Sequence, residues 1–534
     1  MKGVLNTLVV VGAVLIVLGL SMYAAAVFAQ NPDPITDNAQ RMIEEGRQTF
    51  RYDTFGDEAF WGDSLRLHEA VAGEANGGVG PGLSPNAALA LGLKVDAEAL
   101  PAELVSQIEA GEVDLDDPAT TLALLQLNAV VGVTGFFDDS GILTSMGIQC
   151  ALCHSAVDNS FAPGIGARLD GWANRDLNVG AIIALAPDLS VLTELLGVDD
   201  ATVRQVLNSW GPGKYDAELM LDGQAMQPDG ESGATLLPPA FGLAGVNLHT
   251  WTGWGSVTHW NAFVANLAMH GQGTFYDPRL NNPEQFPIAA QAGFGDVRSV
   301  PDLITPELAA LHFYQLAIPA PRPLEGSFDP EAAARGAELF VGRAGCVRCH
   351  VPPLFTEPGW NMHTADEIGI DSFQSSRAPD LHYRTAPLAG LWTHQTGGFY
   401  HDGRFATLPD VIQHYNAFFG LGLTDEEVDE LTQLLLSLPN DTIDWNALQA
   451  NAAAEAMITT VCTAAGAAAN LRSMPSTDAE VMGELGQEER VELIGQTEGA
   501  DGVIWFQTSD GLWVRSDVVT IEGACDALPS VENG

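Results

Sequence analysis

Two short motifs constrain this chain more than any other feature, each a pair of cysteines two residues apart followed at once by a histidine. Two thiols at this spacing add to the two vinyl groups of one haem, and the adjacent histidine then ligates the iron. Chance would produce about 0.002 such motifs in a chain of this composition. We therefore expect two covalently bound c-type haems. The attachment residues are Cys150, Cys153, Cys346 and Cys349, and the axial histidines are His154 and His350.

Paired cysteines also occur in zinc sites and in redox dithiols of the thioredoxin type. A four-cysteine zinc site does not require a histidine directly after each pair, and no strand-helix-strand pattern surrounds either motif. Covalent haem attachment is therefore the favoured interpretation.

The charge balance and the N-terminus indicate an exported protein. The 22 Lys and Arg residues against 69 Asp and Glu leave a formal net charge of −47, which excludes nucleic acid as a partner. Residues 1–29 begin with Lys2 and are almost wholly apolar from residue 8 to residue 29, as in an export signal. The apolar run is long enough to span a bilayer, so both a cleaved signal peptide and an N-terminal membrane anchor stay open. Either places the remaining chain in the periplasm or another extracytoplasmic space.

The two cysteines outside the motifs are Cys462 and Cys525. In an oxidising compartment an even leftover pair predicts a disulfide.

Landmarks recur in the same order in both halves of the chain. A glycine-containing helix precedes each motif, at residues 46–50 and 336–340, and a proline ends each half, at residues 319–323 and at Pro439. The order predicts a mainly α protein with two cytochrome-c-like helical haem domains. The expected divisions are 1–29 (signal peptide or anchor), 30–324 (first haem domain, with large insertions), 325–445 (second haem domain), 446–458 (linker) and 459–527 (β domain).

The last of these divisions has a different character. Short β-type runs at residues 491–494, 504–506 and 512–514 are separated by Gly and Asp turns, which predicts a small all-β barrel. Residues 469–476 with Trp505 and residues 513–515 resemble bacterial SH3-like domains. The resemblance implies contact with the cell wall, the envelope or a protein ligand, and a passive stabilising appendage is the alternative.

The second haem segment resembles the di-haem cytochrome c peroxidase and MauG family. The matching residues are 346–350, 353–356, 383–388, 399–403 and 423–426. The resemblance implies Tyr415 as the second axial ligand of the second haem, with Met362 and His363 as competing ligands. It also implies a calcium ion held near Thr396 and Gly398, and a redox partner such as a small cytochrome or a cupredoxin.

The internal repeat places Trp260 where Tyr415 stands, and an indole cannot ligate iron as a phenolate can. No histidine lies between His154 and His249. The first haem is thus the candidate for an open iron, with a distal pocket formed by His249, His259 and Trp260. His249, His259, Met269 and His270 are alternative ligands, any of which would close it. The expected function is an oxidoreductase that passes electrons through the second haem to peroxide or oxygen at the first; the alternative is a non-enzymatic electron-transfer cytochrome.

Overall fold

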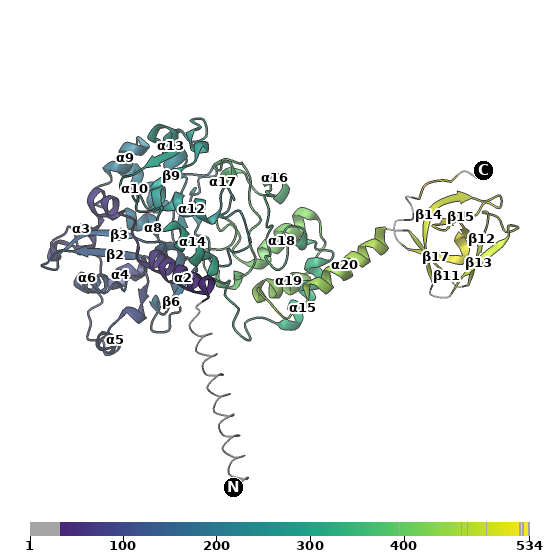
Figure 1. The fold of residues 1–534 in the computed structure, drawn as a ribbon, viewed down its shortest axis with the longest axis horizontal. Coiled ribbons are helices and arrows are strands. Elements are labelled where there is room, and N and C mark those ends of the chain that lie inside the picture. Colours follow the sequence, from purple (N-terminus) through teal and green to yellow (C-terminus); the bar gives the residue numbers. More distant parts are fainter. Residues whose placement is uncertain are drawn as a thin grey trace, which may run out of the picture. The chain divides into compact units, whose positions relative to one another are not determined.

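The computed structural model describes residues 33–394, 396–460, 462–466, 468–486, 489–522, 525 and 528–531. The predicted export segment, residues 1–29, lies outside these ranges. Among the described residues, no helix is both long enough and apolar enough to cross a membrane. The chain forms two compact units (Figure 1). The first comprises Met1–Asp329, Cys349–Val428 and Leu435–Pro439, and the second Pro330–Arg348, Asp429–Leu434 and Asn440–Gly534. The domain limits expected from the sequence stay predictions.

The segment up to Asp329 contains short helices and five two-stranded sheets. Its helices are α2 (Pro34–Tyr52), α3 (Leu67–Ala72), α4 (Pro85–Ala90), α5 (Ala102–Glu109), α6 (Pro118–Gln126), α7 (Ala151–His154), α8 (Val179–Ile183), α9 (Ser190–Leu196), α10 (Asp200–Ser209), α11 (Leu219–Asp222), α12 (Val257–Phe263), α13 (Pro287–Ala292) and α14 (Leu308–Ala317). Its paired strands are β1 (Val95–Asp96) with β5 (Ile165–Gly166), β2 (Val133–Phe137) with β3 (Leu143–Ile148), β4 (Ser155–Val157) with β6 (Arg168–Asp170), β7 (Lys214–Tyr215) with β8 (Thr235–Leu236), and β9 (Thr274–Tyr276) with β10 (Asp296–Arg298).

The described residues after Asp329 form six helices and then a sheet. The helices are α15 (Pro330–Val341), α16 (Ala365–Ile368), α17 (Phe373–Ser376), α18 (Leu408–Phe419), α19 (Asp425–Ser437) and α20 (Trp445–Thr460). The strands are β11 (Thr463–Gly466), β12 (Ala469–Arg472), β13 (Val481–Leu485), β14 (Arg490–Glu498), β15 (Ile504–Thr508), β16 (Trp513–Arg515) and β17 (Val519–Glu522).

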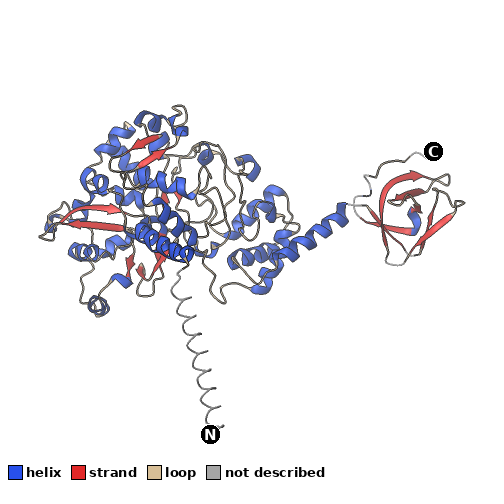
Figure 2. Ribbon diagram, viewed as in Figure 1, coloured by secondary structure: helices blue, strands red, loops and turns tan. Residues whose placement is uncertain are grey.

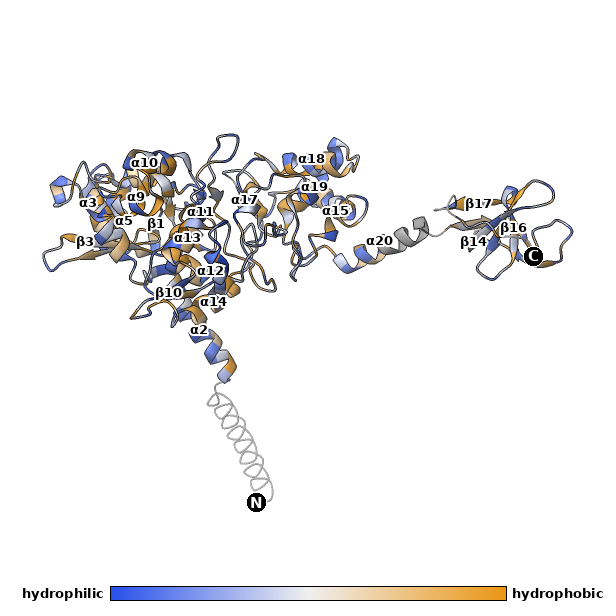
Figure 3. Ribbon diagram, turned by 90° about the horizontal axis from the view of Figure 1, so that it is seen from above, coloured by the Kyte–Doolittle hydropathy of each residue, from blue (hydrophilic) through white to orange (hydrophobic). Residues whose placement is uncertain are grey.

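Helices α2 and α14 pack closely against each other (Figure 1). Helix α2 carries both hydrophilic and hydrophobic residues (Figure 3). Its buried residues include Gly46 and Phe50. A Cβ atom at Gly46 would lie 2.0 Å from the carbonyl oxygen of Ala310, so only glycine permits this helix spacing. Phe50 and Tyr314 then meet edge to face, with ring centroids 5.6 Å apart.

The same close approach recurs in the second half. A Cβ atom at Gly336 on α15 would lie 2.2 Å from the carbonyl oxygen of Glu430 on α19. In both halves, therefore, the helix before the haem motif uses a glycine to pack against the helix that closes the segment. The repeat found in the sequence has a counterpart in packing.

The predicted fold class, mainly α with only a small SH3-like barrel, is wrong. The structure is 39% helix and 16% strand, a mixed composition that includes a seven-stranded antiparallel sheet (Figure 2). The order of its strands is β13-β12-β16-β15-β14-β11-β17. Strands as short as two residues have no periodicity to detect, because backbone pairing and the turns around them decide whether they form.

The core of the C-terminal sheet includes Leu493, Phe506 and Val514. Cys462 and Cys525 are buried in the same core and form a disulfide with an S–S distance of 2.07 Å. The disulfide closes a loop across a sequence separation of 63 residues.

Candidate haem sites

The first motif forms the short helix α7, and its histidine is oriented by a backbone carbonyl. His154 Nδ1 lies 3.0 Å from the carbonyl oxygen of Pro238. Only a protonated Nδ1 can donate to that oxygen, so Nε2 is the nitrogen left with a lone pair for iron. Burial lowers the pKa of His154, which favours the neutral imidazole that ligates metals.

The segment after the motif holds it in place. The amide of Gly171 donates to the carbonyl of His154 at 2.8 Å, and the amide of Asn174 donates to the carbonyl of Cys153 at 2.9 Å. Ser155, at the start of β4, donates to Asp170 on β6 at 2.9 Å. Asp170 also accepts hydrogen bonds from Arg51 on α2 and Tyr314 on α14. The helix pair and the motif are therefore one hydrogen-bonded assembly.

The thiols of the first motif are not poised to be thiolates. Burial raises the pKa of both Cys150 and Cys153 to about 12. Zinc binding and redox exchange both need the thiolate. A redox dithiol, which needs a thiolate with no metal ion to stabilise it, is therefore disfavoured at this motif.

The second motif has the same histidine geometry. Cys346 opens a single 3-10 turn, Cys346–Arg348, and His350 Nδ1 lies 3.1 Å from the carbonyl oxygen of Phe355. Burial lowers the pKa of His350 as well. In each motif the histidine Nδ1 thus lies against a backbone carbonyl, and Nε2 is the nitrogen left to bind iron. Metal-ligating histidines are typically oriented in this way. The residues at both motifs fit c-type haem.

Tyr415 lies on α18, half-buried in a cluster of aromatic rings. Its ring stacks on Phe419 at 5.7 Å and lies 6.3 Å from the ring of Tyr400. Burial, together with Tyr415, raises the pKa of Tyr400. The competing ligand His363 is already engaged, since its Nε2 lies 2.7 Å from Glu357 Oε2. Met362 packs against Gly253, where a Cβ atom would lie 2.9 Å from its sulfur.

The three residues expected in the distal pocket of the first haem form one cluster in the segment 249–260. Trp260 on α12 donates from Nε1 to the carbonyl of His249 at 3.2 Å and stacks on Trp254 at 5.2 Å. His249 Nε2 lies 3.1 Å from the carbonyl of Val246, and burial lowers the pKa of His249 to about 4. These contacts hold the Trp260 indole and one ring nitrogen of His249, whereas His249 Nδ1 is buried and has no hydrogen-bond partner among the described residues.

His259 differs from His249 because an acid lies near its unpaired ring nitrogen. Its Nε2 is buried and makes no hydrogen bond to the described residues. The nearest acid is Asp277, whose Oδ2 lies 3.8 Å away and is already bound by Arg279. Burial lowers the pKa of His259 while Asp277 opposes that shift. His259 is therefore the histidine of this cluster whose unpaired ring nitrogen has a carboxylate nearby.

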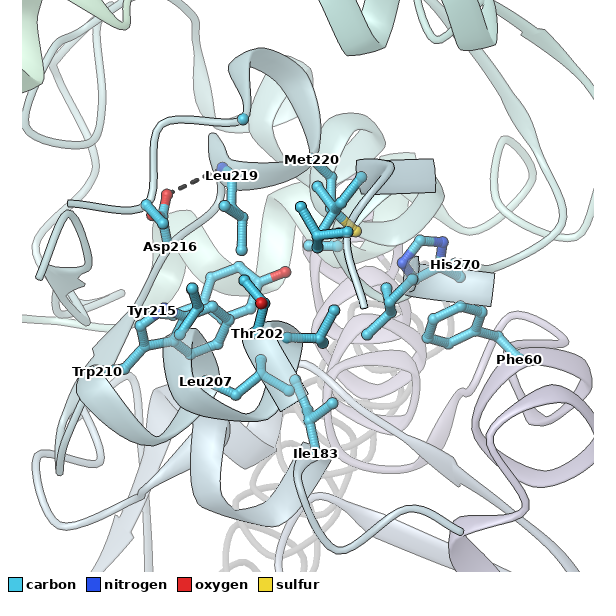
Figure 4. Close-up of a pocket in the computed structure, with 18 of the residues that line it drawn as sticks. Phe60, Ile183, Thr202, Leu207, Trp210, Tyr215, Asp216, Leu219, Met220 and His270 are labelled. Carbon is cyan, nitrogen blue, oxygen red and sulfur yellow. Dashed lines mark hydrogen bonds between the residues drawn. The ribbon is translucent and has the colours of Figure 1, made fainter. Parts of the chain in front are cut away.

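A largely apolar cavity lies among α8, α9, α10 and α11 (Figure 4), and Tyr215 in its wall brings it near Cys153 of the first motif. The cavity has a volume of about 170 Å³ and is partly open to solvent. Tyr215 lies in the cavity wall next to Trp210. Burial raises the pKa of the Tyr215 phenol, and the nearby Cys153 thiol raises it further. His270 faces the same cavity and stacks on Phe60 at 3.7 Å, and burial lowers its pKa to about 4. Such a concave apolar site with few polar groups is typical of small-ligand pockets.

Sequence reasoning missed an aromatic contact between the two halves. Trp172 follows the first motif and Trp392 lies in the second half, and their rings meet edge to face at 5.3 Å. Trp392 is fixed by a hydrogen bond from Nε1 to the carbonyl of Pro321 at 3.0 Å. No local pattern marks either residue, because 220 positions separate them.

A buried arginine, Arg377, also joins the halves. It binds Asp216 and Asp222, each at 2.8 Å, and all three side chains have no exposed surface. Burial raises the pKa of Asp216 to about 6 and that of the neighbouring Glu218 to about 7, while Arg377 opposes both shifts. One cation therefore faces three acidic groups.

The raised pKa values predict that the folded state loses stability as pH rises. The folded state binds the Glu218 proton more tightly than the unfolded state does, so this contribution is complete below the unfolded pKa and is lost as pH passes through about 7. Between pH 5 and pH 8 we expect the free energy of unfolding to fall by about 3 kcal/mol from this group. Urea unfolding should show a much smaller fall in Glu218→Gln. Exposed Glu194→Gln removes the same charge and should keep the wild-type slope; an unchanged slope in Glu218→Gln would refute this assignment.

The calcium expectation concerns Thr396 and Gly398. Backbone atoms crowd there, since a Cβ atom at Gly398 would lie 2.7 Å from the carbonyl oxygen of Gly403. The guanidinium of Arg175 also lies close, with Nη1 3.5 Å from the Cβ position of Gly397. A neighbouring buried cation disfavours a divalent cation, so these residues do not fit calcium well.

Comparison with known proteins gives one partial sequence match. Part of the chain is similar to MauG. The methylamine utilization protein MauG of Methylorubrum extorquens is 31% identical over 88 residues, which cover 16% of this chain. The chain thus spans about a quarter of the length of this curated relative, 24%.

Neither the protein-family profiles nor the solved structures assign the chain to a known fold family. No protein-family profile matches the chain, so the SH3-like resemblance of the C-terminal region is unsupported. Among solved structures, a hydrazine synthase chain of Kuenenia stuttgartiensis is similar over 40% of this chain and 76% of that chain, at 15% identity and a TM-score of 0.26. That value is too low to indicate a shared fold.

Proposed function

We propose that the chain is an exported di-haem c-type oxidoreductase of the cytochrome c peroxidase and MauG type. Electrons enter at the second haem, attached at Cys346 and Cys349, and reach peroxide or oxygen at the first. The partial similarity to MauG and the matching geometry of the two motif histidines support this proposal.

The observation that carries it is the inequality of the two halves. Tyr415 on α18 offers a phenol oxygen as an iron ligand. Its counterpart Trp260 on α12 has no ligating atom, and its N–H is committed to the carbonyl of His249. A haem with two strong axial ligands only transfers electrons, whereas an open position binds a small oxidant. The first haem is therefore the proposed site of chemistry.

The Trp172–Trp392 pair suits electron passage between the halves. Trp172 lies one residue from Gly171, which is bonded to the carbonyl of the ligating His154. Trp392 belongs to the second half, and the two rings are in contact.

Reduction of peroxide also needs a group that moves a proton. His259 is the proposed base, because its unpaired Nε2 is buried and its lowered pKa keeps it neutral near pH 7. Among the described residues of the cluster, Asp277 is placed to stabilise the protonated form.

The second candidate function is electron transfer without catalysis. Met269 and His270 favour it, since Met269 lies in the same core cluster as Cys150 and His270 directs its ring into the adjoining cavity. Either side chain would close the first iron by supplying its sixth ligand.

Electron paramagnetic resonance of the ferric protein at low temperature separates the two functions. The oxidoreductase gives a high-spin signal from the first haem and a low-spin signal from the second, and hydrogen peroxide changes the high-spin signal. Two low-spin signals with no response to peroxide would establish the electron-transfer cytochrome instead. In the same experiment Tyr415→Phe should alter only the low-spin signal, while Tyr276→Phe, at an exposed tyrosine, serves as the control.

The partners and location are part of the proposal. A net charge of −47 steers a cationic donor, such as a small cytochrome or cupredoxin with a basic face. We place the protein in the periplasm or an equivalent space, where the C-terminal sheet contacts the envelope.

A further inference from the structure

Arg175 is a buried cation with no counter-charge. Only 6% of the residue is exposed, and none of its three guanidinium nitrogens has a hydrogen-bond partner among the described residues. A buried charge that is neither paired nor hydrogen-bonded costs several kcal/mol. Burial alone lowers the pKa of Arg175 to about 10, with no acid to oppose the shift.

Two other buried arginines of the chain have the carboxylate partner that Arg175 lacks. Arg377 binds Asp216 and Asp222, and Arg168 binds Asp96 at 3.1 Å. Each of these guanidinium groups has a carboxylate as its partner. The chain has 69 acidic residues, yet none is placed at Arg175 within the described part. The fold therefore leaves a site for a carboxylate that the chain does not supply.

Arg175 lies between the segment that follows the first motif and the segment that follows Trp392 in the second half. Its neighbour Asn174 bonds to the carbonyl of Cys153, in the first motif. Its side chain lies against the segment of His394 and Gly397, which follows Trp392. The groups that face Arg175 are thus the His394 ring and backbone atoms. Burial, together with Arg175, lowers the pKa of His394 to about 3, so its ring is neutral. Neither supplies negative charge.

We propose that Arg175 binds a propionate carboxylate of one of the two haems. A c-type haem held by its vinyl groups keeps both propionates as free carboxylates, and a planar guanidinium is suited to bind one with two hydrogen bonds. The inference rests on the proposed haem binding and adds a positioning residue to it. By holding a positive charge next to the porphyrin, Arg175 stabilises the reduced haem relative to the oxidised haem and keeps the propionate ionised.

Spectroelectrochemical titration of the holoprotein at pH 6, 7 and 8 tests the proposal. In Arg175→Gln the midpoint potential of one haem should fall and should become dependent on pH, because the propionate without its cation takes up a proton in this range. The other haem should keep its potential. Arg298→Gln is the matched control, since Arg298 is more than half exposed and pairs with Asp296. It should shift neither haem.

Three outcomes would overturn the inference. Both potentials could match those of the wild type at every pH while both haems remain attached. Arg175→Gln and Arg298→Gln could cause equal shifts. Added inorganic phosphate could shift the wild-type potential but not that of Arg175→Gln, which would identify a site for free anions.

Arg175→Lys serves if the Gln variant does not accumulate with haem. It keeps the charge but loses the planar two-point contact, so a smaller shift of the same haem is expected. A potential equal to that of the wild type at each pH would then count against the proposal. Covalent haem content, measured in parallel, separates this failure from that of the proposed function, because a wild-type protein without attached haem would refute the function itself.

Discussion

Replacing Cys150 and Cys153 together by alanine should remove one of two covalently attached haems. Each motif supplies both thioether sulfurs for its own haem, and His154 alone cannot hold the group through denaturation. Haem content per chain should fall from two to one, as measured by the pyridine haemochrome spectrum and the mass of the denatured protein. The remaining haem should keep the low-spin signal assigned to the second site.

The reciprocal variant and a matched control complete this test. Cys346→Ala with Cys349→Ala should also leave one haem, but with the high-spin signal. Cys462→Ala with Cys525→Ala should retain both haems, because these sulfurs form the disulfide in the C-terminal sheet. Two attached haems in either motif variant would refute the assignment of that motif.

Replacing Arg377 by methionine should destabilise the protein by about 3–5 kcal/mol, the cost of leaving buried carboxylates without their cation. Its guanidinium also donates to the carbonyl of Gly233 at 3.1 Å, so the substitution breaks contacts with three residues of the first half. Chemical unfolding followed by Soret absorbance and by far-ultraviolet circular dichroism measures the change. Asp216 lines the cavity beside the first motif, so we expect the haem there to be disturbed first.

Arg66→Met is the control for this substitution. Arg66 pairs with Glu69 at 2.7 Å, but its side chain is about half exposed. An exposed pair contributes about 1 kcal/mol or less. Equal losses in the two variants would show that burial of the Arg377 cluster does not govern its contribution.

Local patterns in the chain carried much of the site prediction. A haem motif is complete within five residues, and the glycines of α2 and α15 mark helix faces that meet another helix closely. The capping pattern of Thr424 and Glu427 likewise predicts the start of α19, and both capping hydrogen bonds form there. Such features depend on neighbours in sequence, so the residues suffice to indicate them.

The prediction of fold class failed for the corresponding reason. β1 and β5 are two residues each and pair across about 70 positions, with Val95 opposite Ile165. Neither shows an alternating pattern. The helical periodicity of longer segments predicted a mainly α fold. The pairing of short extended segments into sheets has no local sequence pattern.

Residue types and spacing thus indicated the proposed haem attachment, the repeat and the absence of a ligating atom at Trp260. Only the tertiary structure decided which groups meet across the halves: Trp172 with Trp392, Arg377 with Asp216, and Arg175 with no partner. Coulombic and desolvation energies depend on distance and burial in space, and the sequence specifies these only through the completed fold. The sequence does not distinguish Arg175 from the exposed arginines. Only its burial without a carboxylate partner, which the fold creates, sets it apart.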